Sequence, residues 1–247
     1  MILDAIVQSS RKRAADLLEF SNRELPPCRS LEQAILSRQP AVIGEVKYAS
    51  PAGMTGAVLP PGPFAAALAA GGAAAISVLT EPTVFRGDPS FIPVVRRYVS
   101  LPILRKDILV DFAQIRESRA IGADAVLLIA SVLGSDLLDF VRYAYTCGLE
   151  PVVEVACEEE VEAALATPAR IIGINNRDLT TLAIDPNRSF HLAPQVRSAG
   201  RIAVAMSGIA HPEQVKAYQD CCSAVLIGSA IAAAADPEAA MERFVCM

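Results

Sequence analysis

The sequence contains no tryptophan, only two histidines and no pair of cysteines at Cys-x-x-Cys spacing. His191 and His211 have no partner at the spacing of a metal site, so we expect no metal centre. The six cysteines form no regular framework of the kind found in small secreted domains, and we expect them to stay reduced. These shortages argue against a metalloenzyme and against a disulfide-stabilised domain.

Long hydrophobic runs and clusters of one charge are also missing. No stretch reaches the roughly eighteen apolar residues of a transmembrane helix, and residues 1–13 lack the pattern of a signal peptide. The net charge is −5, and the short basic runs at 11–13 and 96–97 fit solvated helix faces. A nucleic-acid-binding surface would show clustered Lys and Arg. We therefore expect a soluble, cytoplasmic protein that binds neither nucleic acid nor a membrane.

Ala, Val, Ile and Leu dominate the 247 residues, of which 53% are hydrophobic. Eight short apolar runs alternate with segments of helical spacing, a pattern typical of parallel strands covered by helices. The predicted strands lie within 41–51 and at 73–79, 102–107, 125–129, 151–155, 170–175, 202–206 and 224–227. The predicted helices that follow them lie at 63–70, 89–98, 111–121, 136–146, 158–166, 186–196, 212–218, 230–234 and 237–244.

Two further helices are predicted before the first strand, at 3–20 and 30–38, and Ser30 can cap the second. The whole pattern predicts an α/β protein with one (β/α)8 TIM barrel over residues 1–247, in which residues 1–40 form an N-terminal helical extension. An open, doubly wound sheet is the rival fold. It usually carries a Gly-rich nucleotide-binding turn after its first strand, and residues 44–47 do not match that turn.

The first predicted strand carries two charges where it ends. Because side chains alternate along a strand, Glu45 and Lys47 should lie on the same face with their charged groups close together. Pro51 should stop this strand. Two charges in a buried run are costly unless they face solvent, a substrate or each other, which a barrel mouth allows.

Other predicted strands also end in polar residues. In a barrel the carboxyl ends of all strands surround one mouth, where active sites lie. The residues at these ends are Glu45, Lys47, Glu81, Lys106, Glu154, Asn175, Arg177, Ser207, Gly208, Gly228 and Ser229. Together they supply lysines, carboxylates, an amide and two Ser/Gly turns, which are the groups that acid–base catalysis on a phosphorylated substrate needs.

Several of these residues have an ordinary structural explanation as well. Lys106 fits a solvated strand end as well as it fits a catalytic position, and Asn175 begins a segment that fits a turn. Glu81, which precedes Pro82, is expected to be structural. Glu154 is flanked by valines, and a carboxylate inside such a run favours function.

The last two turns fit a phosphate site. Ser207-Gly208 and Gly228-Ser229 each follow an apolar strand, and the second opens a short predicted helix. Backbone N–H groups at such turns bind phosphate, and barrels often place that site after strands seven and eight. We therefore expect a phosphorylated small molecule as the ligand.

Motifs along nearly the whole chain resemble a known family, the indole-3-glycerol phosphate synthases of tryptophan biosynthesis. They are Glu45-Val46-Lys47 with Ser50-Pro51, Leu79-Thr80-Glu81 with Phe85 and Gly87, 104–107, 122–129, Glu154-Val155, 173–179, 207–209 and 226–229. The resemblance implies a carbon–carbon lyase that uses no cofactor. Its reaction closes the indole ring of 1-(2-carboxyphenylamino)-1-deoxyribulose 5-phosphate, with loss of carbon dioxide and water.

The resemblance also implies residue roles. Lys106 would be the general acid at the substrate ketone, and Glu154 and Glu45 would assist dehydration. Lys47 would reach a phosphate or hydroxyl group, and Asn175 would orient the anilino group. The remaining residues would hold the substrate and its phosphate: Ser50, Arg177, Ser207, Gly208, Gly228 and Ser229.

Three positions depart from the family pattern. Met206 stands where the family usually has Glu, Ala52 where it has Ser, and Ile108 where it has Phe. These changes leave an apolar thioether facing the substrate, remove a hydroxyl from the first loop and remove an aromatic wall.

Alternatives to an ordinary synthase therefore stay open. One is a diverged paralogue that acts on a substituted anthranilate-derived substrate. Another is a weakly active barrel subunit of a complex, with the apolar N-terminal helices as its interaction surface. On fold grounds alone, another phosphate-binding barrel enzyme such as a sugar-phosphate isomerase is possible. We expect a monomer or a weak homodimer.

Overall fold

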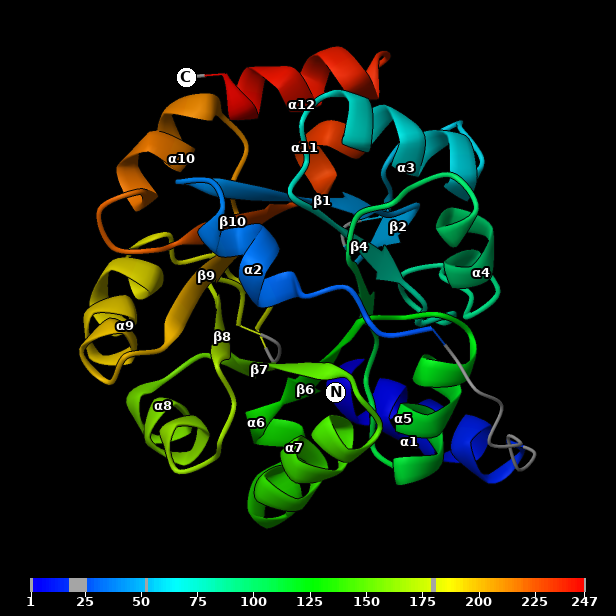
Figure 1. The fold of residues 1–247 in the computed structure, drawn as a ribbon, viewed down its shortest axis with the longest axis vertical. Coiled ribbons are helices and arrows are strands. Elements are labelled where there is room, and N and C mark those ends of the chain that lie inside the picture. Colours follow the sequence, from blue (N-terminus) through cyan, green and yellow to red (C-terminus); the bar gives the residue numbers. More distant parts are fainter. Residues whose placement is uncertain (1, 18–25, 52, 179–180, 247) are drawn as a thin grey trace.

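A computed structural model describes residues 2–17, 26–51, 53–178 and 181–246. Eight parallel strands close into a barrel in the order β1-β10-β9-β8-β7-β6-β5-β4, which confirms the predicted (β/α)8 fold (Figure 1). The barrel strands are β1 (Ala41–Val46), β4 (Ala75–Leu79), β5 (Ile103–Lys106), β6 (Ala125–Ile129), β7 (Glu150–Val155), β8 (Ile171–Asn175), β9 (Ile202–Met206) and β10 (Ala224–Ile227).

Helices surround this barrel. They are α1 (Ile2–Ala15), α2 (Leu31–Leu36), α3 (Pro61–Ala70), α4 (Phe91–Arg96), α5 (Phe112–Ala120), α6 (Ala130–Leu133), α7 (Leu137–Thr146), α8 (Glu158–Leu165), α9 (Asn187–Ser198), α10 (Pro212–Tyr218), α11 (Ser229–Ala232) and α12 (Pro237–Val245), with a 3₁₀ turn at Gly134–Asp136. Among the described residues, no helix is long and apolar enough to cross a membrane.

Side-chain alternation divides the core into two layers. Outward-facing residues such as Val42, Val126 and Ile172 pack against the helices, while inward-facing residues such as Ile43 and Leu127 fill the barrel. The same period of two continues the inward set to the polar residues at the strand ends. The local sequence thus delivers these polar groups to the inside of one mouth.

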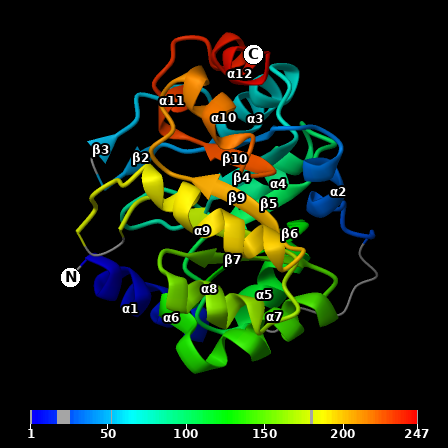
Figure 2. The same cartoon turned by 90° about the vertical axis from the view of Figure 1, so that its left-hand side faces the viewer.

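The two N-terminal helices lie at opposite ends of the barrel (Figure 2). At the amino ends of the strands, Ser30 caps α2, and Leu31 and Ile35 are completely buried inside the barrel. The Glu150 carboxylate accepts hydrogen bonds from Ser30 Oγ at 2.7 Å and from Glu32 N at 2.8 Å. Helix α2 therefore plugs the end away from the predicted site.

Helix α1 lies at the carboxyl ends instead. Its Arg13 makes two bonds to Asp107, at 2.9 and 3.1 Å, and Ser10 Oγ donates to the Ile108 carbonyl. Ile6 of α1 is buried against the inward-facing residues of the barrel. Ile6, Leu31 and Ile35 of these helices thus pack against the barrel, whereas Leu36 at the end of α2 is exposed. The use of these helices as an interaction surface stays a prediction.

Some predicted boundaries were wrong. The first strand ends at Val46 rather than at Pro51, and two short strands, β2 (Ala49–Ser50) and β3 (Gly53–Met54), pair antiparallel after it. Helix α1 ends at Ala15 instead of near residue 20, although 18–20 lie outside the described residues. The helix predicted at 230–234 is α11, which begins and ends earlier.

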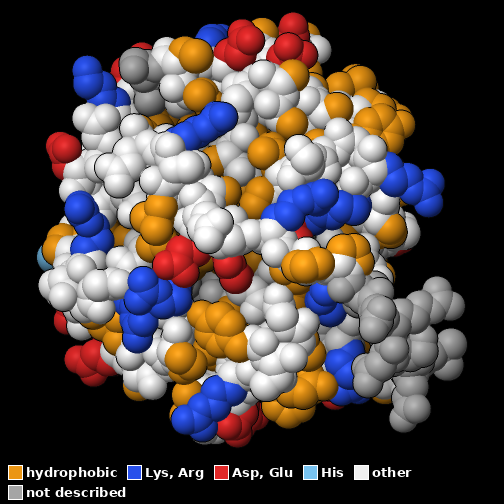
Figure 3. Space-filling view, in the orientation of Figure 1, with side chains coloured by type: hydrophobic (Ala, Val, Ile, Leu, Met, Phe, Trp, Pro, Cys, Tyr) orange, Lys and Arg blue, Asp and Glu red, His pale blue; other side chains and the backbone are white. Residues whose placement is uncertain are grey.

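The distribution of charge on the surface is relevant to the predicted absence of nucleic-acid binding. On the face that carries α2, acidic and basic side chains are interspersed rather than gathered by sign (Figure 3). All six cysteines fall within the described part of the chain and carry free thiols.

Candidate active site

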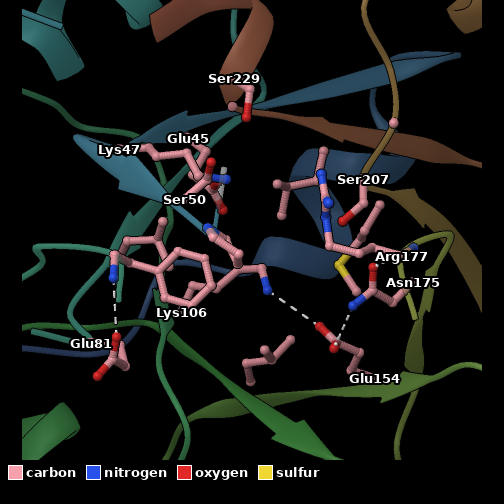
Figure 4. A pocket seen from close by; sticks show the side chains of 18 of the residues that line it. Glu45, Lys47, Ser50, Glu81, Lys106, Glu154, Asn175, Arg177, Ser207 and Ser229 are labelled. Atoms are coloured by element: carbon pink, nitrogen blue, oxygen red, sulfur yellow. Dashed lines mark hydrogen bonds and ion pairs between the residues drawn. The ribbon is translucent and has the colours of Figure 1, made fainter. Parts of the chain in front are cut away.

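A cavity of about 420 Å³ opens at the carboxyl ends of the strands. The catalytic and binding residues predicted from the sequence line it, together with Glu81, which was expected to be structural (Figure 4). They come from most of the barrel strands and the loops that follow them. They are Glu45, Lys47, Ser50, Glu81, Lys106, Glu154, Asn175, Arg177, Ser207, Gly208, Gly228 and Ser229. Ile108 and Met206 line it too, whereas Ala52 lies outside the described residues.

The end of β1 supplies a close ion pair. Lys47 Nζ lies 3.0 Å from Glu45 Oε1, as the period of two predicts. Ser77 Oγ on β4 donates to the other carboxylate oxygen at 3.4 Å. Gly228 packs against Glu45 so closely that a Cβ atom there would overlap Glu45 Oε1. Ser77 on β4 and the residues that follow β1 and β10 therefore surround this carboxylate.

A second polar group faces it across the cavity. Lys106 Nζ lies 3.2 Å from Glu154 Oε2, and Asn175 Nδ2 donates to Glu154 Oε1 at 2.8 Å. Asn175 Oδ1 in turn accepts from the Arg177 backbone N–H at 3.0 Å, which fixes the orientation of the amide. Strands β5, β7 and β8 thus bring an ammonium, a carboxylate and an amide into one hydrogen-bonded row.

The protonation state of Lys106 follows from its neighbours. Burial lowers the pKa of this amine, but the charge of Glu154, the charge of Glu45 and the hydrogen bond to Glu154 together raise the pKa above its ordinary value. Lys106 is therefore a charged ammonium at neutral pH. It can donate a proton to an oxygen in the cavity and stabilise negative charge there.

Residues on either side of Lys106 hold its strand end. Arg105 is fully buried and donates to Asp107 Oδ2 at 3.1 Å and to Glu117 at 2.7 Å. Burial raises the pKa of Asp107, but Arg105, Arg13 and a hydrogen bond from Thr80 outweigh it and hold that pKa below its ordinary value. Asp107 is thus an anionic hub that ties α1, β4 and β5 together.

The turn after β9 has a left-handed backbone. Ser207 and Gly208 have φ values of 68° and 77°, in the left-handed region. Buried Asn176 donates to the Ser207 carbonyl at 3.2 Å and to Tyr218 Oη at 3.1 Å, and it accepts from Ser189. The side chain of Asn176 therefore holds this turn in place.

Two further predicted binding residues, Arg177 and Ser229, lie in loops or at helix starts beyond the strand ends. Arg177 lines the cavity, but its guanidinium also donates to the Leu182 carbonyl at 2.9 Å, so it stabilises its own loop. Ser229 begins α11, immediately after Gly228.

The departures from the family pattern give the cavity aliphatic walls. Met206 is 1% exposed, and its methyl group packs onto Gly173, where a Cβ atom would overlap it. The thioether lines the cavity as predicted but is directed largely into the barrel. Ile108 packs with Ile6 and Ile129 beside the cavity.

Sequence reasoning did not assign some lining residues to the site. Phe85 reaches the cavity from the loop after β4, Ile6 reaches it from α1, and Ile184 reaches it from the segment bridged to Arg177. The apolar stripe of α1 was visible in the sequence, but a stripe does not identify the surface that it covers. No periodic signal marks Phe85 or Ile184, because both lie outside regular elements.

Comparison with known proteins adds an independent observation. The family model described as "Indole-3-glycerol phosphate synthase" matches residues 3–244. The indole-3-glycerol phosphate synthase of Carboxydothermus hydrogenoformans is 46% identical over 86% of this chain and 83% of that protein. The enzyme of the same name from Methanopyrus kandleri is 37% identical over 98% of this chain and 97% of its own length.

Solved structures show the same fold at low identity. A tryptophan synthase chain from M. tuberculosis superposes with a TM-score of 0.65 at 13% identity, over 88% of this chain and 98% of that chain. A thiamine phosphate pyrophosphorylase from Pyrococcus furiosus gives a TM-score of 0.59 at 17% identity, over 85% and 95%. At these identities the likeness concerns the barrel alone.

Proposed function

The chain belongs to the indole-3-glycerol phosphate synthase family, and on that premise we propose that it catalyses the reaction of the family. The enzyme is a carboxy-lyase of tryptophan biosynthesis. It closes the indole ring of 1-(2-carboxyphenylamino)-1-deoxyribulose 5-phosphate and releases carbon dioxide and water. The observation that carries the proposal is the Lys106 ammonium, which lies inside the cavity in contact with Glu154.

Ring closure requires an acid at the ketone. The ring carbon that bears the carboxylate attacks the ketone carbon, and the ketone oxygen takes a proton from Lys106 as the carbon–carbon bond forms. The carbon–carboxylate bond then breaks, carbon dioxide leaves, and its electron pair restores the aromatic ring. The raised pKa of Lys106 keeps the proton available, and its charge stabilises the developing oxyanion.

Dehydration requires a base and an acid on opposite sides of the new ring. The new hydroxyl leaves as water with a proton from an acidic group, while the ring CH2 between the nitrogen and the hydroxyl-bearing carbon gives a proton to a carboxylate, so that the carbon–carbon double bond of the indole forms. Glu154 and Glu45 lie on β7 and β1, on different sides of the cavity, and both are buried. Asn175, bonded to Glu154, lies where it can orient the anilino group.

The phosphate is assigned to the turns after β9 and β10. Ser207, Gly208, Gly228 and Ser229 line the cavity, and the left-handed backbone at the first turn suits N–H groups that converge on an anion. Lys47 lies between these turns and the loop after β4 and can add a positive charge. Ser50 and Arg177 complete the substrate-binding set.

Met206 and Ile108 form an apolar wall of the cavity. This wall is the observation that supports a second candidate function, a synthase for a ring-substituted substrate. An aliphatic wall can accommodate an added methyl or chloro group. A cavity that fits such a group should have a kcat/KM about 10–200-fold higher for the substituted substrate than for the unsubstituted one.

The experiment is a fluorescence time course of indole formation by the purified chain. Wild type should turn over the unsubstituted substrate, and Glu154→Gln should lose most of that rate because its amide cannot act as a base. Substrate that binds without indole formation by wild type would overturn the proposal. A higher kcat/KM for a ring-substituted substrate would instead favour the second candidate.

We also propose that the chain acts as a monomer or a weak homodimer and binds no nucleic acid. The large exposed hydrophobic side chains are distributed over separate elements, among them Leu36, Val58, Tyr98 and Phe190. Sedimentation velocity over a wide range of protein concentrations tests the assembly state.

A further inference from the structure

Glu81 is a buried carboxylate to which the reaction proposed above gives no task. It follows β4, is 1% exposed and lines the cavity wall. Its carboxylate accepts from the backbone N–H groups of Thr83 at 2.8 Å, Val84 at 2.8 Å and Phe85 at 3.1 Å, and from the Thr83 hydroxyl. A carboxylate so bonded exceeds the needs of a simple turn, since a single cap would suffice.

These bonds fold the whole loop after β4 around one side chain. The Glu81 carbonyl also accepts from Gly87 N at 2.8 Å, which closes the loop, and a Cβ atom at Gly87 would overlap the Leu79 carbonyl. Figure 4 shows Glu81 at the edge of the cavity with a hydrogen bond reaching it from the backbone of its own loop. The position of the loop backbone is therefore set by the Glu81 carboxylate.

Phe85 transmits that position into the site. Its own N–H is one of the three that Glu81 binds, and its ring lines the cavity with Lys47 Nζ 5.7 Å from the ring centroid. A cation at this distance is attracted by the negative face of the ring. Lys47 is thus fixed by two groups, the Phe85 ring and the Glu45 carboxylate at 3.0 Å.

We propose that Glu81 is a positioning residue that acts on Lys47 through Phe85. The proposal rests on the function given above and assigns to Glu81 the placement of the ammonium that meets the substrate phosphate or hydroxyl. Glu81 itself touches no reacting atom. Removing its charge releases the loop, withdraws the ring from Lys47 and lets the ammonium turn away.

The first test is a double-mutant cycle between Glu81 and Phe85. Glu81→Gln keeps the size of the side chain but loses the charged acceptor, and kcat/KM should fall by about threefold to thirtyfold, the range expected for one cation–π contact. Phe85→Leu should produce a similar loss, while Phe85→Tyr should retain the wild-type value. In the Phe85→Leu background, Glu81→Gln should lower kcat/KM by less than about twofold, because the ring through which Glu81 acts on Lys47 is already absent.

Asp88 provides the matched control. It lies near the end of the same loop, and its carboxylate accepts a local hydrogen bond from Ser90 N at 2.8 Å. Asp88→Asn makes the same chemical change and should leave kcat/KM unchanged. If the losses of kcat/KM in Glu81→Gln and Phe85→Leu multiply in the double variant, the two residues act independently. That result would show that Glu81 acts on stability alone and would overturn the proposal.

A second readout does not depend on turnover. Acylation of each lysine by a limiting amine reagent, followed by mass spectrometry, reports how free each ammonium is. Lys47 should react faster by the same factor in Glu81→Gln and Phe85→Leu, while exposed Lys12 and Lys216 should not change.

If wild type forms no indole but this pattern holds, the proposed reaction fails and the positioning role stands. If Lys47 reactivity is unchanged in both variants, the positioning role fails. If Glu81→Gln does not fold, Phe85→Leu against Phe85→Tyr still decides whether the ring holds Lys47.

Discussion

The two ends of the barrel are built from the same strands but carry different kinds of side chain. At the amino ends, α2 inserts Leu31 and Ile35 among aliphatic residues. At the carboxyl ends, the inward positions are Glu45, Lys106, Glu154 and Asn175, around an open cavity.

The difference shows how one alternating pattern serves two purposes. In β1, β5, β7 and β8, inward aliphatic residues (Ile43, Leu104, Val152 and Ile171) contribute stability by leaving water. Nearer the carboxyl end, each of these four strands carries an inward polar residue, which must be paired and contributes chemistry instead. Substitutions at the two ends should therefore affect different measurements.

The largest effect is expected at the mouth. Lys106→Ala should lower kcat by about 10³–10⁴-fold with substrate affinity nearly intact, because proton donation and charge stabilisation act mainly in the transition state. The free energy of unfolding should fall by only about 1–3 kcal/mol, since Glu154 keeps its bond from Asn175. Indole fluorescence and urea unfolding measure the two quantities. A variant that kept turnover and lost affinity would contradict the role of Lys106.

The reverse behaviour is expected at the plugged end. Leu31→Ala removes a completely buried side chain and should lower the free energy of unfolding by about 2–5 kcal/mol. At temperatures well below unfolding, kcat should stay within about twofold of wild type, because α2 does not reach the cavity. A large loss of kcat in the folded variant would mean that the two ends are coupled.

Acid should weaken the mouth through Asp107. The folded-state pKa of this carboxyl lies below its unfolded value of about 3.9, so its contribution to stability is present above that value and is lost as the pH falls through the folded pKa. Arg13→Gln removes one cause of the depression and should cost about 1–3 kcal/mol at pH 7. Urea unfolding below about pH 4 should show the gap between wild type and variant narrowing. A gap that widens in acid would contradict the assigned direction.

The smallest effect belongs to an exposed pair at the plugged end. Arg170 lies 3.2 Å from Glu32 of α2, and the two side chains are 50% and 26% exposed. Glu32→Gln should change the free energy of unfolding by no more than about 0.5 kcal/mol, because solvent screens such pairs. The expected difference should disappear at high salt. A cost comparable to that of Leu31→Ala would mean that charge, not burial, secures α2.

Much of this arrangement could be predicted because it follows from two periods. The alternation of apolar runs and helical segments predicts the barrel, and the period of two within β1 places Glu45 beside Lys47. Lys106 and Glu154 are 48 positions apart, yet they meet because parallel strands end at the same mouth.

The rest depended on contacts that carry no periodic signal. Strands β2 and β3 have two residues each, too few to show alternation. The place of Phe85 depends on a loop folded around a side chain, not on a repeat. The amphipathic stripes of α1 and α2 predict that each helix is buried, but the opposite ends they cover are decided by partners such as Asp107 and Glu150.

The position of α2 at the amino ends of the strands also has a consequence for folding during synthesis. Ser30 binds Glu150, 120 positions further along the chain, and synthesis at 5–20 residues per second places roughly ten seconds between the two. Throughout that interval Leu31 and Ile35 have been made while the strand that anchors their helix has not. Helix α2 is thus among the first segments to leave the ribosome and among the last to reach its native contacts. Nascent chains that stop before β7 should therefore leave the apolar residues of α2 exposed to chaperones.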